Sequence, residues 1–348
     1  MEQDLFISAS AGTGKTHTIS VAYIDIFDRA FRNNDPLNVG NVVAITFTRK
    51  AAAQMKSRIL DMIRQQEADD VRWQQLKSSM AFAWISTIDS FAARILSEVG
   101  VYARIAPDIQ IGSDSQVSSI LDRCIFRAFF EHEDLIEPLI RHLTLDDLSR
   151  ALKRAVKERR YAMMRSRPAG KEEAGLRLHG DSSIAESLVF ASDAFKKLFE
   201  EVYRSFQEEM QEENLTDFAG VLVTLRELLA SPENAWIKER YSSQFRYIIV
   251  DEFQDTDSLQ KEVLDLVCGE HSRIICVGDA KQSIYRFRGA EVEVFSDARE
   301  MIRSEGGVVR HLERNFRSHP DILNLCNAFY PLVFHSSDKR YSQSYEPV

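Results

Sequence analysis

Residues 4–19 read DLFISASAGTGKTHTI, and this stretch decides the fold. Residues 4–8 have the apolar composition of a buried parallel strand. After Thr16, apolar residues recur with helical spacing at Ile19, Ala22, Tyr23, Ile26 and Ala30. A strand, a short loop of small residues and a helix, in this order, predict a loop that binds phosphate.

The loop has the pattern of a nucleotide-binding phosphate loop, with Ala9 where a glycine is usual. Small side chains allow backbone N–H groups to turn inward around phosphate oxygens at the N-terminus of the next helix. We expect Lys15 to reach the outer phosphates of ATP and the Thr16 hydroxyl to bind Mg²⁺. The predicted nucleotide-binding residues are Ala9, Ser10, Ala11, Gly12, Thr13, Gly14, Lys15, Thr16 and His17. The alternative is a glycine-rich turn with a solvated lysine, and the flanking strand and helix disfavour it.

The stretch YIIVDEFQDTDSLQ, residues 247–260, supplies the acids that such a loop lacks. An acidic pair follows an apolar strand, so Asp251 is predicted to hold Mg²⁺ and Glu252 to orient and deprotonate the attacking water. Solvated acids that end a strand are the alternative. It does not explain why Gln254 and Asp255 stand in the same cluster.

A third strand ends in VGDAKQSIYRFRGA, residues 277–290. Gln282 is a candidate sensor of the terminal phosphate. Tyr285 and Phe287 alternate with arginines, a pattern that suits stacking on unpaired bases. Local sequence alone leaves open that both aromatic rings belong to the core.

The remaining pattern predicts the α/β class, a P-loop NTPase domain with a parallel sheet and an inserted all-helical subdomain. Residues 41–48, 247–252 and 273–279 are β-branched, apolar and end in polar residues, as central parallel strands do. From about residue 95 to residue 215, the apolar spacing is mostly helical.

Composition limits the function classes. The 348 residues are 44% hydrophobic and 28% charged, which is typical of a soluble protein with more than one core. A net charge of −9 gives no support to nucleic-acid binding as a bulk property, so any such site must be local.

Four scattered cysteines disfavour a zinc or iron–sulfur site and fit a reducing compartment. No signal sequence or long apolar run is present, so we expect a cytoplasmic protein without a membrane partner.

Six stretches resemble, in correct order, the motifs of superfamily 1 DNA helicases of the UvrD/Rep type. They are SASAGTGKT, TFTRKAAAQMKSRI (46–59), ISTIDSFAARIL (85–96), DEFQDT, GDAKQSIYRFRGA and LERNFRS (312–318). The first and fifth look most like the RecB/AddA branch, the motor subunits of ATP-dependent helicase–nucleases. The matches cover the first 95 residues and those from about 215 on.

The resemblance implies a role for each matching residue. It assigns MgATP binding and hydrolysis to Lys15, Thr16, Asp251 and Glu252, and contact with the γ-phosphate to Gln282 and Arg317. It assigns contact with DNA to Phe47, Thr48, Arg49, Ser86, Thr87, Phe91, Tyr285, Phe287 and Arg288. Among these, Tyr285 and Phe287 match the family's base-stacking pair, which favours stacking over a core position.

Two departures from the family pattern concern the second and third motifs. Arg49 replaces an asparagine, and Asp89 stands where a histidine is often found. In addition, no clear adenine-reading glutamine motif precedes the phosphate loop.

The resemblance implies a RecA-like ATPase domain formed by residues 1–95 and 215–312, with a helical insertion at 96–214. Residues 313–348 are expected to begin a second RecA-like domain. The sequence ends about thirty residues after Arg317, so we expect this piece to lack most of that domain and any nuclease domain.

The implied function is that of an ATP-dependent, 3′-to-5′ DNA helicase and single-stranded DNA translocase in double-strand-break repair. Its cofactors would be ATP and Mg²⁺. Its partners would be single-stranded DNA, duplex/single-strand junctions and a second helicase–nuclease subunit. We expect these residues alone to bind ATP and, weakly, DNA, with slow hydrolysis. The alternatives are an ATP-gated binding module without hydrolysis and an unrelated phosphate-loop switch, which the aromatic–arginine motif disfavours.

Residues 150–171 concentrate nine cations in a chain of negative net charge. They form either a local DNA-binding surface or a solvated helix face balanced by acids such as Glu208 and Glu212. The position within the helical insertion, where relatives touch incoming duplex, slightly favours DNA.

Overall fold

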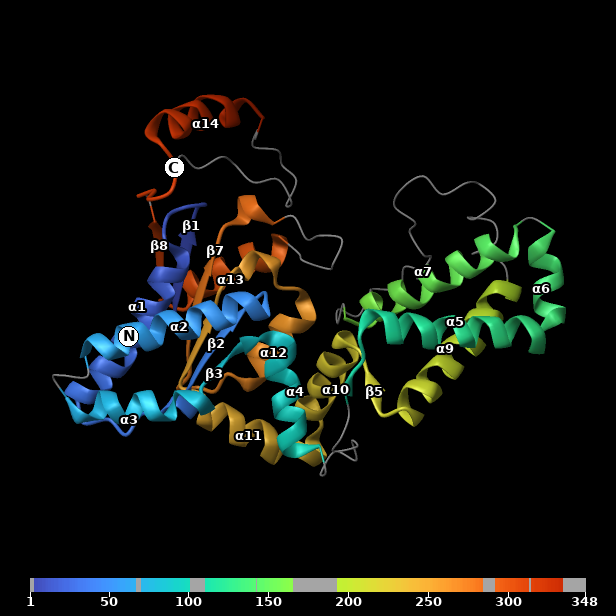
Figure 1. The fold of residues 1–348 in the computed structure, drawn as a ribbon, viewed down its shortest axis with the longest axis horizontal. Coiled ribbons are helices and arrows are strands. Elements are labelled where there is room, and N and C mark those ends of the chain that lie inside the picture. Colours follow the sequence, from blue (N-terminus) through green and yellow to red (C-terminus); the bar gives the residue numbers. More distant parts are fainter. Residues whose placement is uncertain are drawn as a thin grey trace. The chain divides into compact units, whose positions relative to one another are not determined.

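The structure, a computed structural model, describes residues 3–66, 70–100, 110–141, 143–164, 193–283, 292–312 and 314–333. The chain divides into two compact units (Figure 1). Unit 1 comprises Met1–Ile95 and Leu225–Val348, and unit 2 comprises Leu96–Thr224.

A six-stranded parallel sheet forms the centre of unit 1, with the strand order β3-β2-β6-β7-β1-β8. Its strands are β1 (Leu5–Ala9), β2 (Val42–Thr46), β3 (Trp84–Thr87), β6 (Tyr247–Val250), β7 (Arg273–Gly278) and β8 (Val308–Leu312). Because parallel strands end at the same edge, the motifs that follow β1, β6 and β7 meet although they are far apart in the sequence. The α/β fold with a parallel sheet, predicted from the sequence, is confirmed.

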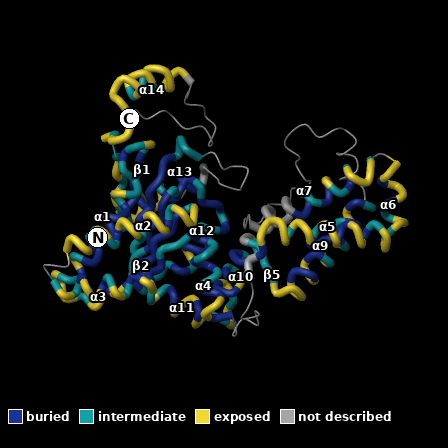
Figure 2. The backbone as a smooth tube through the Cα atoms, viewed as in Figure 1, coloured by how far each residue is buried: buried dark blue, intermediate teal, exposed yellow. Residues whose placement is uncertain are grey.

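Alternation along β1 directs its side chains to two cores. Leu5, Ile7 and Ala9 belong to a buried cluster that includes residues of the helices α1 (Lys15–Arg32), α2 (Arg49–Gln66) and α3 (Val71–Ser79). Phe6 points to the other face, where its ring centroid lies 4.9 Å from that of Phe295. Figure 2 shows the strands largely buried, with exposed stretches on the surrounding helices.

The helices of unit 1 follow the strands in the alternation typical of α/β proteins. They are α1 (Lys15–Arg32), α2 (Arg49–Gln66), α3 (Val71–Ser79), α11 (Ala235–Gln244), α12 (Ser258–Val267), α13 (Val292–Ser304) and α14 (Pro320–Val333). Short 3₁₀ turns are η1 (Val39–Asn41), η2 (Met80–Phe82), η3 (Pro232–Asn234), η4 (Phe253–Asp255) and η5 (Ala280–Gln282). Helices α4 (Ile88–Val99) and α10 (Phe218–Ala230) carry the chain across the division between the units.

Unit 2 has its own core. Its helices are α5 (Asp114–Glu131), α6 (Glu133–Ile140), α7 (Leu145–Met164) and α9 (Asp193–Glu212), and buried residues from these helices form one cluster. Glu209 is buried on α9. Its Oε2 accepts from the guanidinium group of Arg123 at 3.0 Å, and its Oε1 forms an ion pair with that of Arg127, at 2.6 Å. A buried carboxylate requires cationic partners, and both arginines lie on α5. The two ion pairs therefore link α5 to α9.

The second boundary of unit 2 lies later in the sequence than residues 214/215, where the sequence predicts it. Strand β5 (Leu215–Thr216) pairs with β4 (Gln110–Ile111), and Gly112 N–H donates to Thr216 O. This small sheet holds residues 215 and 216 within unit 2, and a pattern of helical spacing carries no signal of such a pairing.

Candidate nucleotide and DNA site

The phosphate loop joins β1 to α1, and its glycines adopt backbone conformations that other residues rarely take. Gly12 has φ +80° and Gly14 has φ +90°, both in the left-handed region. The Thr13 side chain donates to Ser10 O at 2.7 Å, which closes the loop on itself. Helix α1 has no side-chain cap and no acid in its first turn. Its N-terminus is therefore suited to an anion.

Lys15 brings three predicted catalytic residues together. Its ammonium lies 3.3 Å from Glu252 Oε2 and donates to Gln282 Oε1 at 3.3 Å. The Gln282 amide is held at its other end, where Nε2 donates to Asp279 Oδ2 at 2.7 Å. The residues that follow β1, β6 and β7 thus share one cluster at the carboxyl edge of the sheet.

Two of the acids after β6, Asp251 and Asp255, are held in an environment that disfavours their charged forms. Burial and, to a lesser extent, the charge of Glu252 raise the pKa of Asp251 to about 7. Burial and the same neighbour raise the pKa of Asp255 to about 6. Glu252 itself has φ 51°, a conformation that costs energy in a residue with a side chain and that occurs often at functional sites.

This cluster fits Mg²⁺ held jointly by the protein and a nucleotide. Three carboxyls, those of Asp251, Glu252 and Asp255, lie near the ammonium of Lys15. Asp255 Oδ1 is buried and accepts no hydrogen bond from the described residues. Within those residues, no group of three or more His, Cys, Asp or Glu is arranged to hold a metal ion by itself. Mg²⁺ usually retains waters and phosphate oxygens beside one or two protein ligands, so Thr16 and Asp251 suit such a shared site.

Gln254 belongs to this site, although the motifs assign it no role. It is only 2% exposed, and its Nε2 donates to Glu252 Oε2 at 2.8 Å. Its Oε1 accepts from Asp279 N–H at 2.8 Å. Both ends of one amide therefore fix the candidate base relative to the end of β7. The only sequence signal for this role of Gln254 is its position, two residues after Glu252.

Arg317, predicted to contact the γ-phosphate, follows β8 and lies beside the phosphate loop. A Cβ placed on Gly12 would lie 2.8 Å from Arg317 Cβ and 2.8 Å from Asn315 Nδ2. Gly12 therefore allows the turn after β8 to approach the loop. The motifs assign no role to Asn315 either.

The predicted DNA residues after β2 and β3 also lie at the carboxyl edge of the sheet. Thr48 is exposed, and its Oγ1 accepts from Ala51 N–H at 3.1 Å, so it caps α2. Arg49 and Lys50 are exposed in the first turn of α2, which contains no acid. Two cations at a helix N-terminus oppose the helix dipole, so the arrangement is suited to an anionic ligand.

The other predicted DNA contacts are less accessible. Phe47 and Ser86 are half-buried, and the buried Thr87 donates from Oγ1 to Ser90 Oγ at 3.0 Å. The prediction for Phe91 is wrong: its ring is fully buried and lies 5.6 Å, centroid to centroid, from each of Trp84 and Phe245. Phe91 faces this aromatic core because helical periodicity turns its side chain inward, and a motif match alone does not show which face a residue occupies.

The sequence pattern of the "UvrD/REP helicase N-terminal domain" matches residues 1–303. The chain belongs to this family. It is similar to DNA helicase II of Escherichia coli strain K12, with 29% identity over 328 residues. It is also similar to DNA helicase II of Salmonella typhimurium strain LT2, with 29% identity over 327 residues. Each alignment covers 93% of this chain and 38% of the relative. The ATP-dependent DNA helicase PcrA of Leuconostoc citreum is 27% identical over 343 residues, 97% of this chain and 38% of that protein. The chain spans about two fifths of the length of these relatives.

Some predictions for this UvrD/REP helicase domain fall outside the described residues. They include Tyr285, Phe287 and Arg288, together with residues 165–171 of the basic run. Within the described part of that run, Arg150 pairs with Asp147, and Lys153 Nζ lies 2.5 Å from Asp122 Oδ1. Each of these two cations is paired with an acid, which favours a helix face balanced by acids over a surface of unpaired positive charge.

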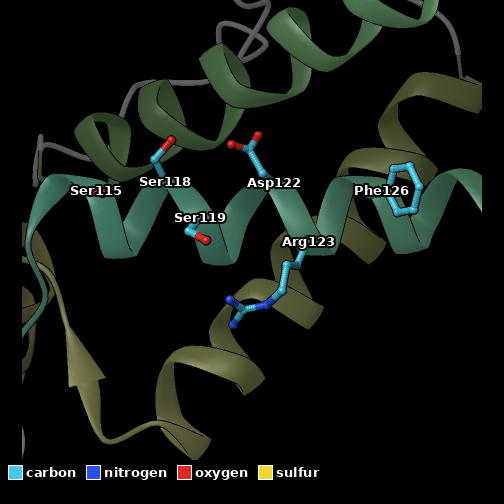
Figure 3. Close-up of a pocket in the computed structure, with 6 residues that line it drawn as sticks. All are labelled: Ser115, Ser118, Ser119, Asp122, Arg123 and Phe126. Carbon is cyan, nitrogen blue, oxygen red and sulfur yellow. The ribbon is translucent and has the colours of Figure 1, made fainter.

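A shallow hollow lies along α5 in unit 2, and its lining includes no residue predicted to act on ATP. Figure 3 shows it, with Phe126 on the outside of the helix and Arg123 directed toward α9. Its lining comes from the single helix α5, so it is a surface feature of that helix rather than an enclosed site.

Of the helices that the structure describes, none has the length and apolar character needed to cross a membrane.

Proposed function

We propose that this chain is the N-terminal motor domain of an ATP-dependent DNA helicase of the UvrD/PcrA type. The observation that carries the proposal is the cluster at Lys15, whose ammonium contacts both Glu252 and Gln282. Phosphate binding, water activation and terminal-phosphate sensing each need one of these groups, and the three belong to different motifs.

The residues divide the chemistry of ATP hydrolysis among them. The phosphate loop and Lys15 bind the polyphosphate, and Glu252 accepts a proton from the attacking water. Gln254 fixes the direction of the Glu252 carboxylate through their 2.8 Å hydrogen bond. Gln282 and Arg317 contact the terminal phosphate, where an arginine can contribute roughly 10³–10⁵ in rate. Thr16 and Asp251 would hold Mg²⁺ together with the nucleotide, and the ion would supply positive charge against the phosphates.

The same edge of the sheet is proposed to bind single-stranded DNA. The exposed Arg49 at the start of α2 would contact a phosphate. Thr48 and Ser86 supply nearby polar groups at the ends of β2 and β3. Base stacking on Tyr285 and Phe287 remains a prediction from the sequence.

A narrower assignment rests on the sequence motifs alone. We propose that the full-length protein translocates 3′-to-5′ and acts with a second subunit of a helicase–nuclease in double-strand-break repair. The relatives named above are DNA helicase II and PcrA. The support for the RecB/AddA branch is therefore the residue sequence of the motifs KQSIYRFRGA and ASAGTGKT alone. The cytoplasmic location also remains a prediction.

ATP turnover with and without single-stranded DNA tests the proposal, for the wild-type chain and for Glu252→Gln. DNA-stimulated turnover that disappears in Glu252→Gln would show a working catalytic centre in these residues. We expect slow turnover for the wild-type chain and unchanged ATP binding for Glu252→Gln, because the base acts after the nucleotide is bound. ATP binding without any turnover, even when a longer version of the chain is tested, would favour an ATP-gated binding module instead.

A further inference from the structure

The turn that follows β8 lies directly against the phosphate loop. Asn315 Nδ2 donates to Ala11 O at 2.7 Å, and Phe316 N–H donates to Gly12 O at 2.9 Å. Two successive carbonyls of the loop are therefore held by one short segment that is far away in the sequence.

The Asn315 side chain also organises its own turn. Its Oδ1 accepts from the N–H groups of Arg317 and Ser318, each at 2.9 Å. One amide thus binds the phosphate loop through its nitrogen and fixes the backbone of Arg317 through its oxygen. An asparagine is suited to both tasks, because its side chain carries a donor and an acceptor.

These contacts also determine where a donor of the loop points. In a planar trans peptide, the C=O of one residue and the N–H of the next point in opposite directions. With the Ala11 carbonyl directed at Asn315, the Gly12 N–H points away from the turn, toward the side on which a phosphate would bind. Gly12 precedes the first helical residue, Lys15, by three positions, so this donor serves the outer end of a triphosphate rather than the inner phosphates at the start of α1.

We propose that Asn315 is a positioning residue that couples the phosphate loop to Arg317 and so selects a nucleotide triphosphate over a diphosphate. The inference rests on the proposed function only in that the loop must bind a nucleotide. Two groups depend on Asn315: the Gly12 N–H, and the backbone from which the Arg317 side chain would reach the terminal phosphate. A residue that only stabilised a surface turn would affect the two nucleotides equally.

Binding of fluorescent ATP and ADP analogues, each titrated with Mg²⁺, tests this role in the wild-type chain and three variants. Asn315→Ala removes the contacts at both ends of the amide. Asn315→Asp keeps an acceptor for Arg317 and Ser318 but places a carboxylate oxygen against Ala11 O. Asn324→Ala is the control, since Asn324 is an exposed asparagine on α14.

We expect both Asn315 variants to lower the ratio of ATP to ADP affinity by about tenfold, the equivalent of one or two hydrogen bonds. Asn324→Ala should keep the wild-type ratio. Thermal unfolding of each variant shows whether it folds, and should Asn315→Ala fail to fold, Asn315→Asp alone decides the result.

An unchanged ratio in folded Asn315 variants would overturn the inference while leaving the proposed function intact. An equal loss of affinity for both nucleotides would also overturn it, because it would indicate a structural role only. A wild-type chain that binds neither analogue would overturn the proposed function and, with it, this inference.

Discussion

The carboxyl edge of the sheet has two parts that are built differently. After β1, β6, β7 and β8, the polar side chains bond to one another across distant segments, as Lys15 does with Glu252 and Gln282. After β2 and β3, the hydroxyls bond only to near neighbours, as Thr48 does with Ala51 and Thr87 with Ser90. The first part is organised before a ligand arrives, and the second leaves the cation of Arg49 exposed to solvent.

The difference matches what each part is proposed to bind. Phosphoryl transfer requires groups fixed to within a fraction of an ångström, so a preorganised network favours it. A moving DNA strand requires weak contacts that can be released, and exposed cations and hydroxyls provide these. Substitutions in the first part should therefore have larger effects than substitutions in the second.

The largest expected effect is on nucleotide binding by Lys15→Ala. The substitution removes the ammonium that contacts the Glu252 and Gln282 side chains. We expect MgATP affinity to fall about 100-fold, because hydrogen bonds from a charged donor to phosphate are strong. Calorimetric titration measures this. Lys50→Ala, which changes an exposed lysine on α2, should leave MgATP affinity unchanged, and an equal loss there would erase the distinction between the two parts.

Gln254→Met tests whether the network is preorganised from within. The substitution has little effect on side-chain volume but leaves the buried Asp279 N–H without its acceptor. We expect the free energy of unfolding to fall by about 2 kcal/mol in urea denaturation. The control is Gln65→Met, at an exposed position of α2, which should stay within about 0.5 kcal/mol of the wild type. Equal stability of the two variants would mean that the Gln254 contacts contribute little.

Asp89→Asn tests the part of the edge that follows β3. Burial raises the pKa of Asp89 to about 6, although its own backbone N–H and the charge of Arg49 act in the opposite direction. The folded state thus holds the proton more tightly than the unfolded state, whose carboxyl titrates near its usual pKa of about 4. Stability of the wild type should therefore fall as pH rises from about 4 to about 6.

The Asn variant lacks this titration, so its advantage over the wild type should grow across the same interval and then stay constant. Above pH 6, the free energy of unfolding of the Asn variant should exceed that of the wild type by at most about 3 kcal/mol. Loss of any hydrogen bond made by the Asp89 carboxylate would reduce this difference. Thermal unfolding across this pH range measures the difference. Asp61→Asn, at a side chain that is 59% exposed, should show no such trend. A difference that is constant from pH 4 to pH 8 would contradict the raised pKa of Asp89.

The smallest expected effect is on DNA binding by Arg49→Ala. Loss of one phosphate contact should lower the affinity for single-stranded DNA roughly threefold and reduce the dependence of log affinity on log salt by about 0.7. Fluorescence anisotropy at several salt concentrations measures both quantities. Arg64→Ala removes an exposed arginine that pairs with Asp61 at the other end of α2. If it reduced the salt dependence equally, the effect of Arg49 would be one of net charge rather than of position.

Local pattern was sufficient to predict the parallel α/β fold. It also named Lys15, Glu252 and Gln282, which the structure brings together, while their contact with a nucleotide stays a prediction. The alternation of apolar strands and helices predicted the parallel sheet, and the spacing in ASAGTGKT predicted the loop before α1. It was not sufficient for Phe91, whose motif position suggested contact with DNA while its helix turns the ring into the core. Nor did it assign a role to Gln254 or Asn315, because the partners of both lie on other segments of the chain.

The sequence by itself determined which chemical groups are present at the ends of the strands, since a strand that is buried on both faces must end in polar residues at the sheet edge. Only the tertiary structure decided which of these groups meet. The order β3-β2-β6-β7-β1-β8 places the ends of β7 and β8 on either side of β1. The residues that follow these neighbouring strands, Gln282 and Asn315, therefore reach the phosphate loop. Strand order is a global property, because it depends on how all the strands and helices pack, and no local stretch of sequence contains it.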